Sequence, residues 1–249
     1  MRFARPTTHQ SATPASPAHN DLAGRLARGR VHEVYAQEND NAAGAAGFTA
    51  AVAVTLTGPG QAVLWLRTRR AARSGGLLQA NGWAELGGFP GTALIGELPD
   101  AVTLLRAAVD ALRCPALGAV IVEVWGVMRE LDLTASRRLA LAAEKSGVPL
   151  VLLGIEASPV PSAAQTRWQV ASAPSRALPG NAPGLPTFNV TLLRQRGGPG
   201  GLAWQLEWDR DRCMFREAPL PGAVVSVPAD RPDAAGGSGA VFRIGRCAA

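Results

Sequence analysis

GRVHEVYAQENDNAAG, residues 29–44, is the stretch that decides how this chain is expected to fold. Val31–Ala36 has the composition of a short strand, a polar turn follows it, and the alanine-rich segment Ala42–Val54 predicts a helix packed back on that strand. Strand, loop and helix in this order make up the phosphate-binding unit of nucleotide-binding α/β proteins. We therefore expect Val31–Ala36 to be a central strand of an α/β sheet.

The same loop lacks the side chains that bind a nucleotide. In a working phosphate loop a Lys reaches the β- and γ-phosphate oxygens, and a Ser or Thr hydroxyl holds Mg²⁺. Those positions fall near Ala42 and Ala43, which offer neither a charge nor a metal ligand. The single Lys of the chain, Lys145, lies in a segment that predicts a helix far from this loop. The sequence thus predicts a degenerate phosphate loop, no cofactor and no enzymatic activity.

Composition limits the class of protein further. The 249 residues are 47 % hydrophobic, enough to bury one sizeable core, and no apolar run is long enough to cross a bilayer. The first twenty residues lack the apolar core of a signal peptide, so we expect a cytoplasmic protein without a membrane partner. The three cysteines and three histidines show no metal-ligand spacing. A net charge of +6 is weak evidence for an acidic partner such as DNA.

Apolar runs and amphipathic segments alternate through the next hundred residues. This alternation predicts a mostly parallel sheet flanked by helices, with right-handed crossovers. The expected strands are Ala62–Leu66, Ala93–Leu98, Gly118–Trp125 and Leu150–Gly154. The expected helices run from Pro99-Asp100 to near Pro115 and from Ala135 to Ser146, the second with Thr134 as its N-cap.

The pattern changes towards the C-terminus. Arg167–Ser172, Thr187–Arg196 and Ala203–Trp208 predict strands, the last two joined as an antiparallel hairpin by a glycine-rich turn. Their tryptophans are interpreted as core packing in preference to base-stacking platforms. We expect three parts in the chain: a disordered tail at residues 1–20, one core domain at 21–217, and a second disordered tail at 218–249.

Arginines and one glutamate are the candidate functional residues. Arg67, Arg69, Arg70 and Arg73 follow a predicted central strand and are expected in a loop at its carboxyl end, either as a solvated basic loop or as a contact for DNA or protein. Arg137 and Arg138, on the first turn of a predicted helix, are further candidate contacts.

Glu123 ends the most strand-like run, where a second ATPase motif would place the acid that orients the water shell of Mg²⁺. The alternative, which we favour, is a structural carboxylate bound to a backbone amide or an Arg, because the loop has no phosphate-binding side chains.

Four separated motifs, taken together, resemble the ImuA family, the RecA-like accessory proteins of bacterial mutagenesis cassettes. The motifs are Gly29–Ala36, Leu131–Leu139, Thr166–Val170 and Leu206–Asp209, and the resemblance covers roughly residues 22 to 215. It implies a RecA-like core of the P-loop NTPase type. It also implies action with ImuB, an inactive Y-family-like protein, and with a DnaE-type error-prone polymerase in translesion synthesis during the SOS response to DNA damage. RecA is a further candidate partner.

The resemblance also allows a comparison with the phosphate loop of RecA, position by position. Glu33-Val34-Tyr35 and Glu38 are similar to the approach to its phosphate loop, whereas Asn41, Ala42 and Ala43 stand where that loop has Gly, Lys and Thr. Glu123 takes the acidic position of the second motif.

Three hypotheses follow from the sequence. The leading one is a non-catalytic adaptor that links polymerase components, with weak sequence-independent DNA binding through the arginines. The second is a weak ATP-binding protein that recruits Arg67, Arg69 or Arg70 in place of the missing Lys. The third is a SulA-like inhibitor of cell division, another shortened RecA-like fold.

Overall fold

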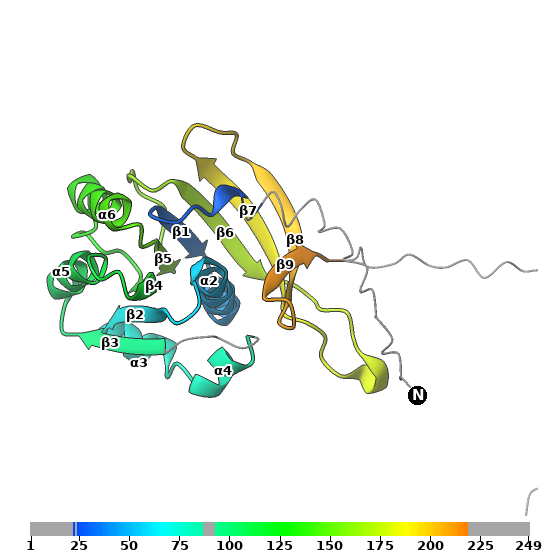
Figure 1. The fold of residues 1–249 in the computed structure, drawn as a ribbon. Helices are drawn as coiled ribbons and strands as arrows, with labels where there is room; N and C mark the ends of the chain where they lie inside the picture. The colour runs from blue at the N-terminus through cyan, green and yellow to red at the C-terminus, as the bar shows by residue number, and fades with distance from the viewer. Residues whose placement is uncertain (1–21, 23, 87–92, 219–249) are drawn as a thin grey trace, which may run out of the picture. The chain divides into compact units, whose positions relative to one another are not determined.

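The computed structural model describes residues 22, 24–86 and 93–218, and these residues build one sheet of nine strands (Figure 1). The strands lie in the order β3-β2-β4-β5-β1-β6-β7-β8-β9. In chain order they are β1 (Val31–Ala36), β2 (Ala62–Thr68), β3 (Ala93–Leu98), β4 (Leu117–Trp125), β5 (Leu150–Ile155), β6 (Thr166–Ser172), β7 (Thr187–Gln195), β8 (Leu202–Asp209) and β9 (Met214–Glu217). The helices are η1 (Asn39–Asn41), α2 (Ala42–Leu56), α3 (Arg69–Gly75), α4 (Ala80–Ala84), α5 (Ala101–Ala111), α6 (Leu133–Ser146) and η2 (Pro179–Asn181).

Strand β1 lies in the middle of the sheet, as the sequence predicts. It pairs in parallel with β5 on one side and β6 on the other, so that Val34 lies opposite both Leu153 and Trp168. The pairs from β3 to β6 are all parallel, and β7, β8 and β9 continue the sheet antiparallel. The expected fold class, a mostly parallel sheet flanked by helices with a C-terminal antiparallel hairpin, is therefore confirmed.

Helix α2 packs on one face of the sheet, opposite α5 and α6 (Figure 1). Its residues are mostly buried because it is apolar on all sides, and Phe48 stacks against Phe188 and Phe215. Small side chains let the helix approach the strands closely. A Cβ added at Gly44 would lie 2.2 Å from the Ser172 hydroxyl of β6. The alanine-rich composition that predicts this helix is thus also what lets it sit deep in the core.

Helices α5 and α6 cover the other face with narrower apolar stripes. Leu104 and Ala108 of α5 and its C-cap Leu112 are buried, and so are Leu139 and Ala143 of α6. Helix α5 begins after Asp100, as predicted, with the Asp100 carboxylate accepting from the Thr103 amide at 2.8 Å.

The predicted N-cap of the next helix is wrong. Helix α6 begins at Leu133, and the Asp132 carboxylate accepts from the Ala135 amide at 2.7 Å. Thr134 is the second residue of the helix and lies two residues after the N-cap position.

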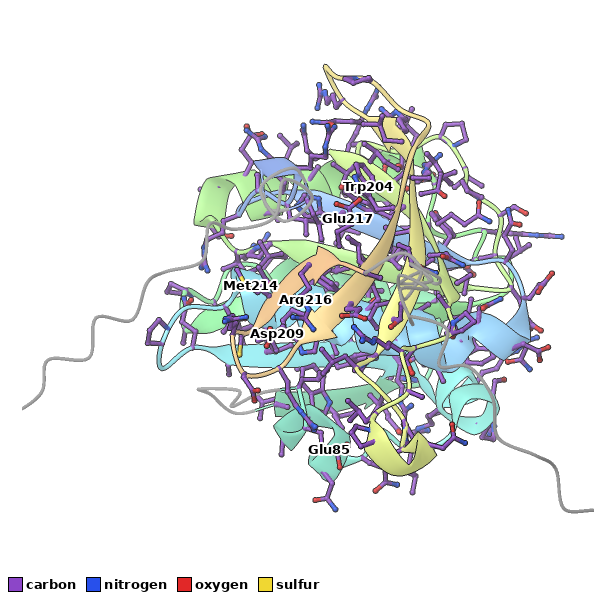
Figure 2. The ribbon with its side chains drawn as sticks, turned by 90° about the vertical axis from the view of Figure 1, so that its right-hand side faces the viewer. Glu85, Trp204, Asp209, Met214, Arg216 and Glu217 are labelled. Carbon is purple, nitrogen blue, oxygen red and sulfur yellow. The ribbon has the colours of Figure 1, made fainter. Side chains whose placement is uncertain are left out.

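The tryptophans of the antiparallel part pack in the core, which confirms their structural interpretation. Trp168 and Trp208 are fully buried, and Trp204 is partly buried with its ring 6.1 Å from that of Trp168. Figure 2 shows this end of the sheet, where Arg216 of the edge strand β9 lies beside Asp209 of β8. The Arg216 guanidinium also approaches the buried Glu207 carboxylate to 3.1 Å.

The expected tails at residues 1–20 and 218–249 lie outside the described residues, apart from Ala218, so their boundaries stay predictions. No helix in the described ranges is long and apolar enough to cross a membrane.

Candidate functional site

The degenerate loop and Glu123 come together at one place, the N-terminal end of α2. After β1 the chain makes the short turn η1, and α2 begins at Ala42. The Asn41 side chain leaves its own helix uncapped and accepts from the Ser172 amide at 3.0 Å, which ties the loop to β6. A pocket of about 250 Å³ lies here, with Ala42, Ala43 and Glu123 in its lining. We call it the remnant site.

Both oxygens of the Glu123 carboxylate are already occupied. This side chain is buried, and it accepts hydrogen bonds from the indole of Trp65 at 2.7 Å and from the indole of Trp125 at 2.6 Å. The Arg67 guanidinium lies 4.0 Å away. The favoured structural interpretation of Glu123 therefore agrees with its surroundings, although its hydrogen-bond donors are indoles instead of a backbone amide. Each oxygen of this carboxylate thus already accepts one hydrogen bond inside the protein, which supports a structural role.

Arg67 is not in an exposed loop, and this expectation is corrected. It belongs to β2 and its side chain is 2 % exposed. One terminal nitrogen donates to the Glu97 carboxylate at 2.9 Å, the other donates to the Gly76 carbonyl at 2.8 Å, and the buried Nε has no partner in the described part of the chain. Arg67 is thus enclosed by the protein itself and is withdrawn from any contact with DNA.

The other three arginines of that group lie on helix α3, which replaces the expected loop. Arg69, Arg70 and Arg73 are exposed there and remain available to a partner. Arg67 is buried because it faces the same way as Val63 and Trp65, towards the core. The strand register places it between Glu97 of β3 and Glu123 of β4, so one positive charge lies in a row with two negative charges.

This arrangement opposes phosphate binding. A helix N-terminus ordinarily attracts anions, but Asp40 and Glu123 line the same pocket, and two carboxylates already share the charge of Arg67. Helix α3 also closes the site from the side. A Cβ added at Gly75 would lie 2.9 Å from the ring of Trp125 and 3.1 Å from Glu123. The remaining 250 Å³ is below the volume of roughly 300–1,000 Å³ that small-molecule sites usually have.

A metal ion fits no better. Within the described residues, no group of three or more His, Cys, Asp or Glu side chains is placed to hold one. The remnant site can stabilise the fold through its buried hydrogen bonds.

Two of the sequence motifs meet side by side in the sheet, which sequence reasoning did not find. Glu33 of β1 lies opposite Arg167 of β6, and Arg167 Nε donates to the Glu33 carboxylate at 2.6 Å. The Arg167 guanidinium also lies 5.8 Å from the centre of the Tyr35 ring. Burial, with the nearby Glu33 charge, raises the pKa of Tyr35. The sequence contains Glu33 and Arg167 in two predicted strands, but only the strand register shows that they lie opposite each other.

His32 occupies the neighbouring position of the same strand pair. Its Nε2 donates to the Ala27 carbonyl at 2.9 Å, and its Nδ1 accepts from the Thr166 hydroxyl at 2.7 Å. That hydroxyl in turn accepts from the Trp168 indole at 2.7 Å. Burial lowers the pKa of His32 from 6.5 to about 4, so the ring is neutral at physiological pH.

Arg137 and Arg138 lie on α6, on the face of the sheet opposite the remnant site, and both are exposed. The structure therefore divides the predicted site residues into three groups. Asn41, Ala42, Ala43, Arg67 and Glu123 lie at or beside the remnant site, Arg69, Arg70 and Arg73 lie on α3, and Arg137 and Arg138 lie on α6.

Comparison with known proteins adds a relative that spans nearly the whole chain. Protein ImuA of Caulobacter vibrioides, from strain NA1000 / CB15N and from strain ATCC 19089 / CIP 103742 / CB 15, is 34 % identical over 235 residues, which cover 88 % of this chain and 89 % of the relative. No family model matches the sequence. Among solved structures, the crystal structure of the RadB recombinase matches with a TM-score of 0.48 and 12 % identity, over 83 % of this chain and 99 % of that chain.

Proposed function

This chain belongs to the ImuA family, and from that premise we propose that it is a non-catalytic, RecA-like adaptor of translesion DNA synthesis. In this role it joins an ImuB-type, Y-family-like protein to a DnaE-type error-prone polymerase when DNA is damaged, with RecA as a further candidate partner. The ImuA relationship favours the adaptor, and no observation favours a SulA-type inhibitor of cell division.

The observation that supports the non-catalytic part is the set of side chains at the remnant site. Phosphoryl transfer depends on positive charge and a metal ion placed around the phosphates, and these supply most of the rate acceleration. At this site alanines replace the loop Lys and hydroxyl, and Glu123 is held by two indoles. A fold that keeps the shape of a nucleotide-binding domain without its chemistry supports a role in binding other proteins.

The alternative is weak ATP binding through an Arg, and Arg67, the candidate that lies at the remnant site, is already engaged. Arg67 lines the remnant site, but Glu97 and the Gly76 carbonyl already hold its terminal nitrogens, while Arg69 and Arg70 are exposed on α3. Isothermal titration of the full chain with ATP and Mg²⁺ tests this alternative. We expect no heat of binding, and a saturable heat would restore it.

Weak contact with DNA is part of the adaptor proposal. Arg69, Arg70 and Arg73 are three exposed positive charges on one short helix, and Arg-phosphate contacts release counterions, which makes binding sensitive to salt. Replacing all three by Ala is expected to weaken binding of a single-stranded oligonucleotide and to flatten its salt dependence. Unchanged affinity would remove DNA contact at α3 from the proposal.

The adaptor role itself is tested by co-purification and by genetics. The full chain is expected to co-purify with the ImuB-type protein of the same organism and with the polymerase. Deletion of its gene is expected to lower damage-induced mutagenesis to the level of an ImuB deletion. No binding to ImuB, together with unchanged mutagenesis, would sink the proposal.

A further inference from the structure

Helix α6 presents an exposed line of alternating aliphatic and basic side chains. Leu133, Arg137, Leu141 and Lys145 follow one another at intervals of four residues, so they lie along one side of the helix. Leu133 is 39 % exposed and Leu141 is 66 % exposed. Together with the exposed Arg138 these residues form what we call the α6 ridge. The two exposed leucines therefore lie on the same side of the helix as the basic residues.

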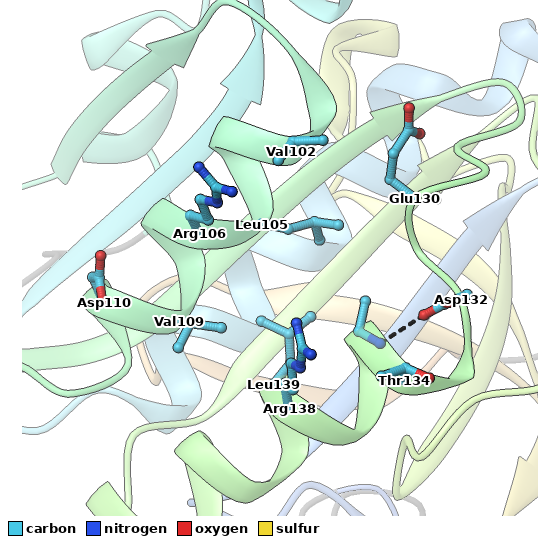
Figure 3. A pocket seen from close by; sticks show the side chains of 11 residues that line it. Val102, Leu105, Arg106, Val109, Asp110, Glu130, Asp132, Thr134, Arg138 and Leu139 are labelled. Carbon is cyan, nitrogen blue, oxygen red and sulfur yellow. Dashed lines mark hydrogen bonds between the residues drawn. The ribbon is translucent and has the colours of Figure 1, made fainter.

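A groove runs along the ridge on the side of α5 (Figure 3). A pocket of about 580 Å³ lies between the two helices, and Leu105 and Val109 of α5 face Arg138 and Leu139 of α6 across it. A second pocket, of about 540 Å³, shares Val109 and Arg138 with the first and reaches Leu141 and Lys145. Aliphatic side chains of both helices thus line the groove together with charged ones. Asp110, Glu130 and Asp132 lie in the first pocket, whereas the second pocket contains Arg113, Arg138 and Lys145 and no carboxylate.

The other side of the ridge is hollowed in the same way. A pocket of about 420 Å³ lies between α6 and the end of β7, with Leu133, Arg137, Leu141, Arg194 and Arg196 in its lining. An adjoining pocket of about 440 Å³ shares Leu133 and Arg194 with it and includes Val160, which is exposed. The α6 ridge thus lies between two hollows that both contain aliphatic and basic side chains, and the one beside β7 has fewer carboxylates.

The acids around the ridge are largely committed elsewhere. Asp132 caps α6, Asp110 pairs with Arg113 at 3.0 Å, and Glu144 pairs with Arg30 at 2.8 Å. Glu130 is the exposed carboxylate at the mouth of the α5 groove. By contrast, no ion pair within the described ranges engages Arg137, Arg138, Lys145 or Arg196. The surface as a whole has an excess of unneutralised positive charge.

We infer that the α6 ridge and its two grooves are a docking surface for a partner-protein segment that carries aliphatic anchors flanked by acidic residues, in the form of an amphipathic helix. Such a helix offers apolar side chains three or four residues apart, a spacing that fits a groove between packed helices. Its acidic residues would meet Arg137, Arg138 and Lys145. The inference deepens the proposed adaptor function, on which it rests, by naming the surface that binds the partner.

The absence of aromatic side chains from the lining of these four pockets favours a protein over a nucleic acid as the partner. None of the residues that line the four pockets is aromatic, and sequence-tolerant binding of single strands depends on aromatic side chains that stack on bases. Phosphate alone would also leave Leu133 and Leu141 in water. A segment that supplies both leucine-like anchors and carboxylates satisfies both parts of the surface.

The first test uses a matched pair of full-length variants. The ridge variant carries Leu141→Glu and Arg138→Glu. The control variant carries the same two types of change at Leu178→Glu and Arg176→Glu, an exposed pair in the connection before β7. The ridge variant is expected to bind the ImuB-type protein at least about tenfold more weakly than the wild type, because buried anchors carry most of an interface's energy. The control is expected to keep the wild-type affinity.

If ImuB binds the ridge variant as well as the wild type, the docking surface is overturned and the adaptor role stands. If ImuB binds none of the three proteins, the adaptor role fails, and the second test decides the surface by itself.

The second test uses synthetic peptides and needs no natural partner. An amphipathic helical peptide with Leu anchors and Glu flanks is titrated into the full chain, beside one peptide with Lys for Glu, another with Ser for Leu, and a single-stranded oligonucleotide. Only the Leu and Glu peptide is expected to bind, and the ridge variant is expected to lose that binding while the control keeps it. Equal binding of the Ser peptide or the oligonucleotide would mean that the surface recognises negative charge alone, which overturns the inference.

Discussion

The remnant site and the α6 ridge contain similar kinds of side chain, and they use them in opposite ways. At the remnant site the buried charged groups face other groups of the same chain: Glu123 accepts from two indoles, and Arg67 pairs with Glu97. On the α6 ridge Arg137, Arg138 and Leu141 face solvent. Buried polar groups that are satisfied internally stabilise a fold, whereas exposed groups without partners are free to bind. This difference is why we propose that partners bind at the α6 ridge, on the opposite face of the sheet, and not at the remnant site.

The largest expected effect comes from removing the carboxylate at the centre of the remnant site. Glu123→Ala leaves the indole donors of Trp65 and Trp125 and the charge of Arg67 without their partner, and breaking such a buried network costs about 3–5 kcal/mol. Urea unfolding of the variant measures the loss. Glu130→Ala, at an exposed carboxylate, is the matched control and should change stability by no more than about 0.5 kcal/mol.

The next effect is pH dependence at His32. Its pKa falls from 6.5 to about 4 on folding, so between these values the unfolded chain binds a proton that the folded chain does not. Stability from this group is present above pH 6.5 and is lost as the pH falls towards 4, by up to about 3 kcal/mol. The measurement is the unfolding free energy of the wild type and of His32→Gln across this range. Identical pH dependence of the two proteins would show that His32 is not buried and neutral.

The third prediction compares a buried arginine, Arg67, with an exposed one, Arg70, three positions further along the chain. Arg67→Ala removes a buried side chain with two hydrogen bonds and should cost about 2–3 kcal/mol, whereas Arg70→Ala is at an exposed position and should cost no more than about 0.5 kcal/mol. Thermal and urea unfolding compare the two variants. Equal stabilities would place Arg67 outside the core, as the sequence alone suggests.

The smallest effect concerns how the ridge is held in place. Asp132→Ala removes the N-cap of α6 and should destabilise the protein by about 1 kcal/mol, while Thr134→Ala should change its stability only slightly. Chemical unfolding of both variants distinguishes the two candidate caps. A larger loss with Thr134→Ala would contradict the observed start of the helix.

Local patterns predicted the fold class and most of its elements, but not β9 or the short helices α3 and α4. Apolar runs gave each strand from β1 to β8, because buried parallel strands are continuous apolar segments and the hairpin strands alternate. The meeting of Ala42, Ala43 and Glu123 was also predictable, since the carboxyl ends of parallel strands lie beside the helix N-termini that follow them.

The rest depended on long-range geometry. Arg67 was expected in a loop because the apolar run stops at Leu66, and only the strand register reveals the two acids beside it. The Glu33 to Arg167 pair joins residues 134 positions apart in sequence, so no local pattern contains it. The grooves beside α6 exist only once α5 and β7 are packed around that helix.

The central claim is that partner binding has moved from the remnant site to the α6 ridge, and one complementation experiment tests it most directly. A strain without the gene receives the wild type, the ridge variant, or Ala43→Glu, which places a negative charge at the exposed mouth of the remnant site and excludes phosphate. Damage-induced mutation frequency is then measured. We expect Ala43→Glu to restore mutagenesis like the wild type and the ridge variant to fail. Restoration by the ridge variant with failure of Ala43→Glu would contradict the account.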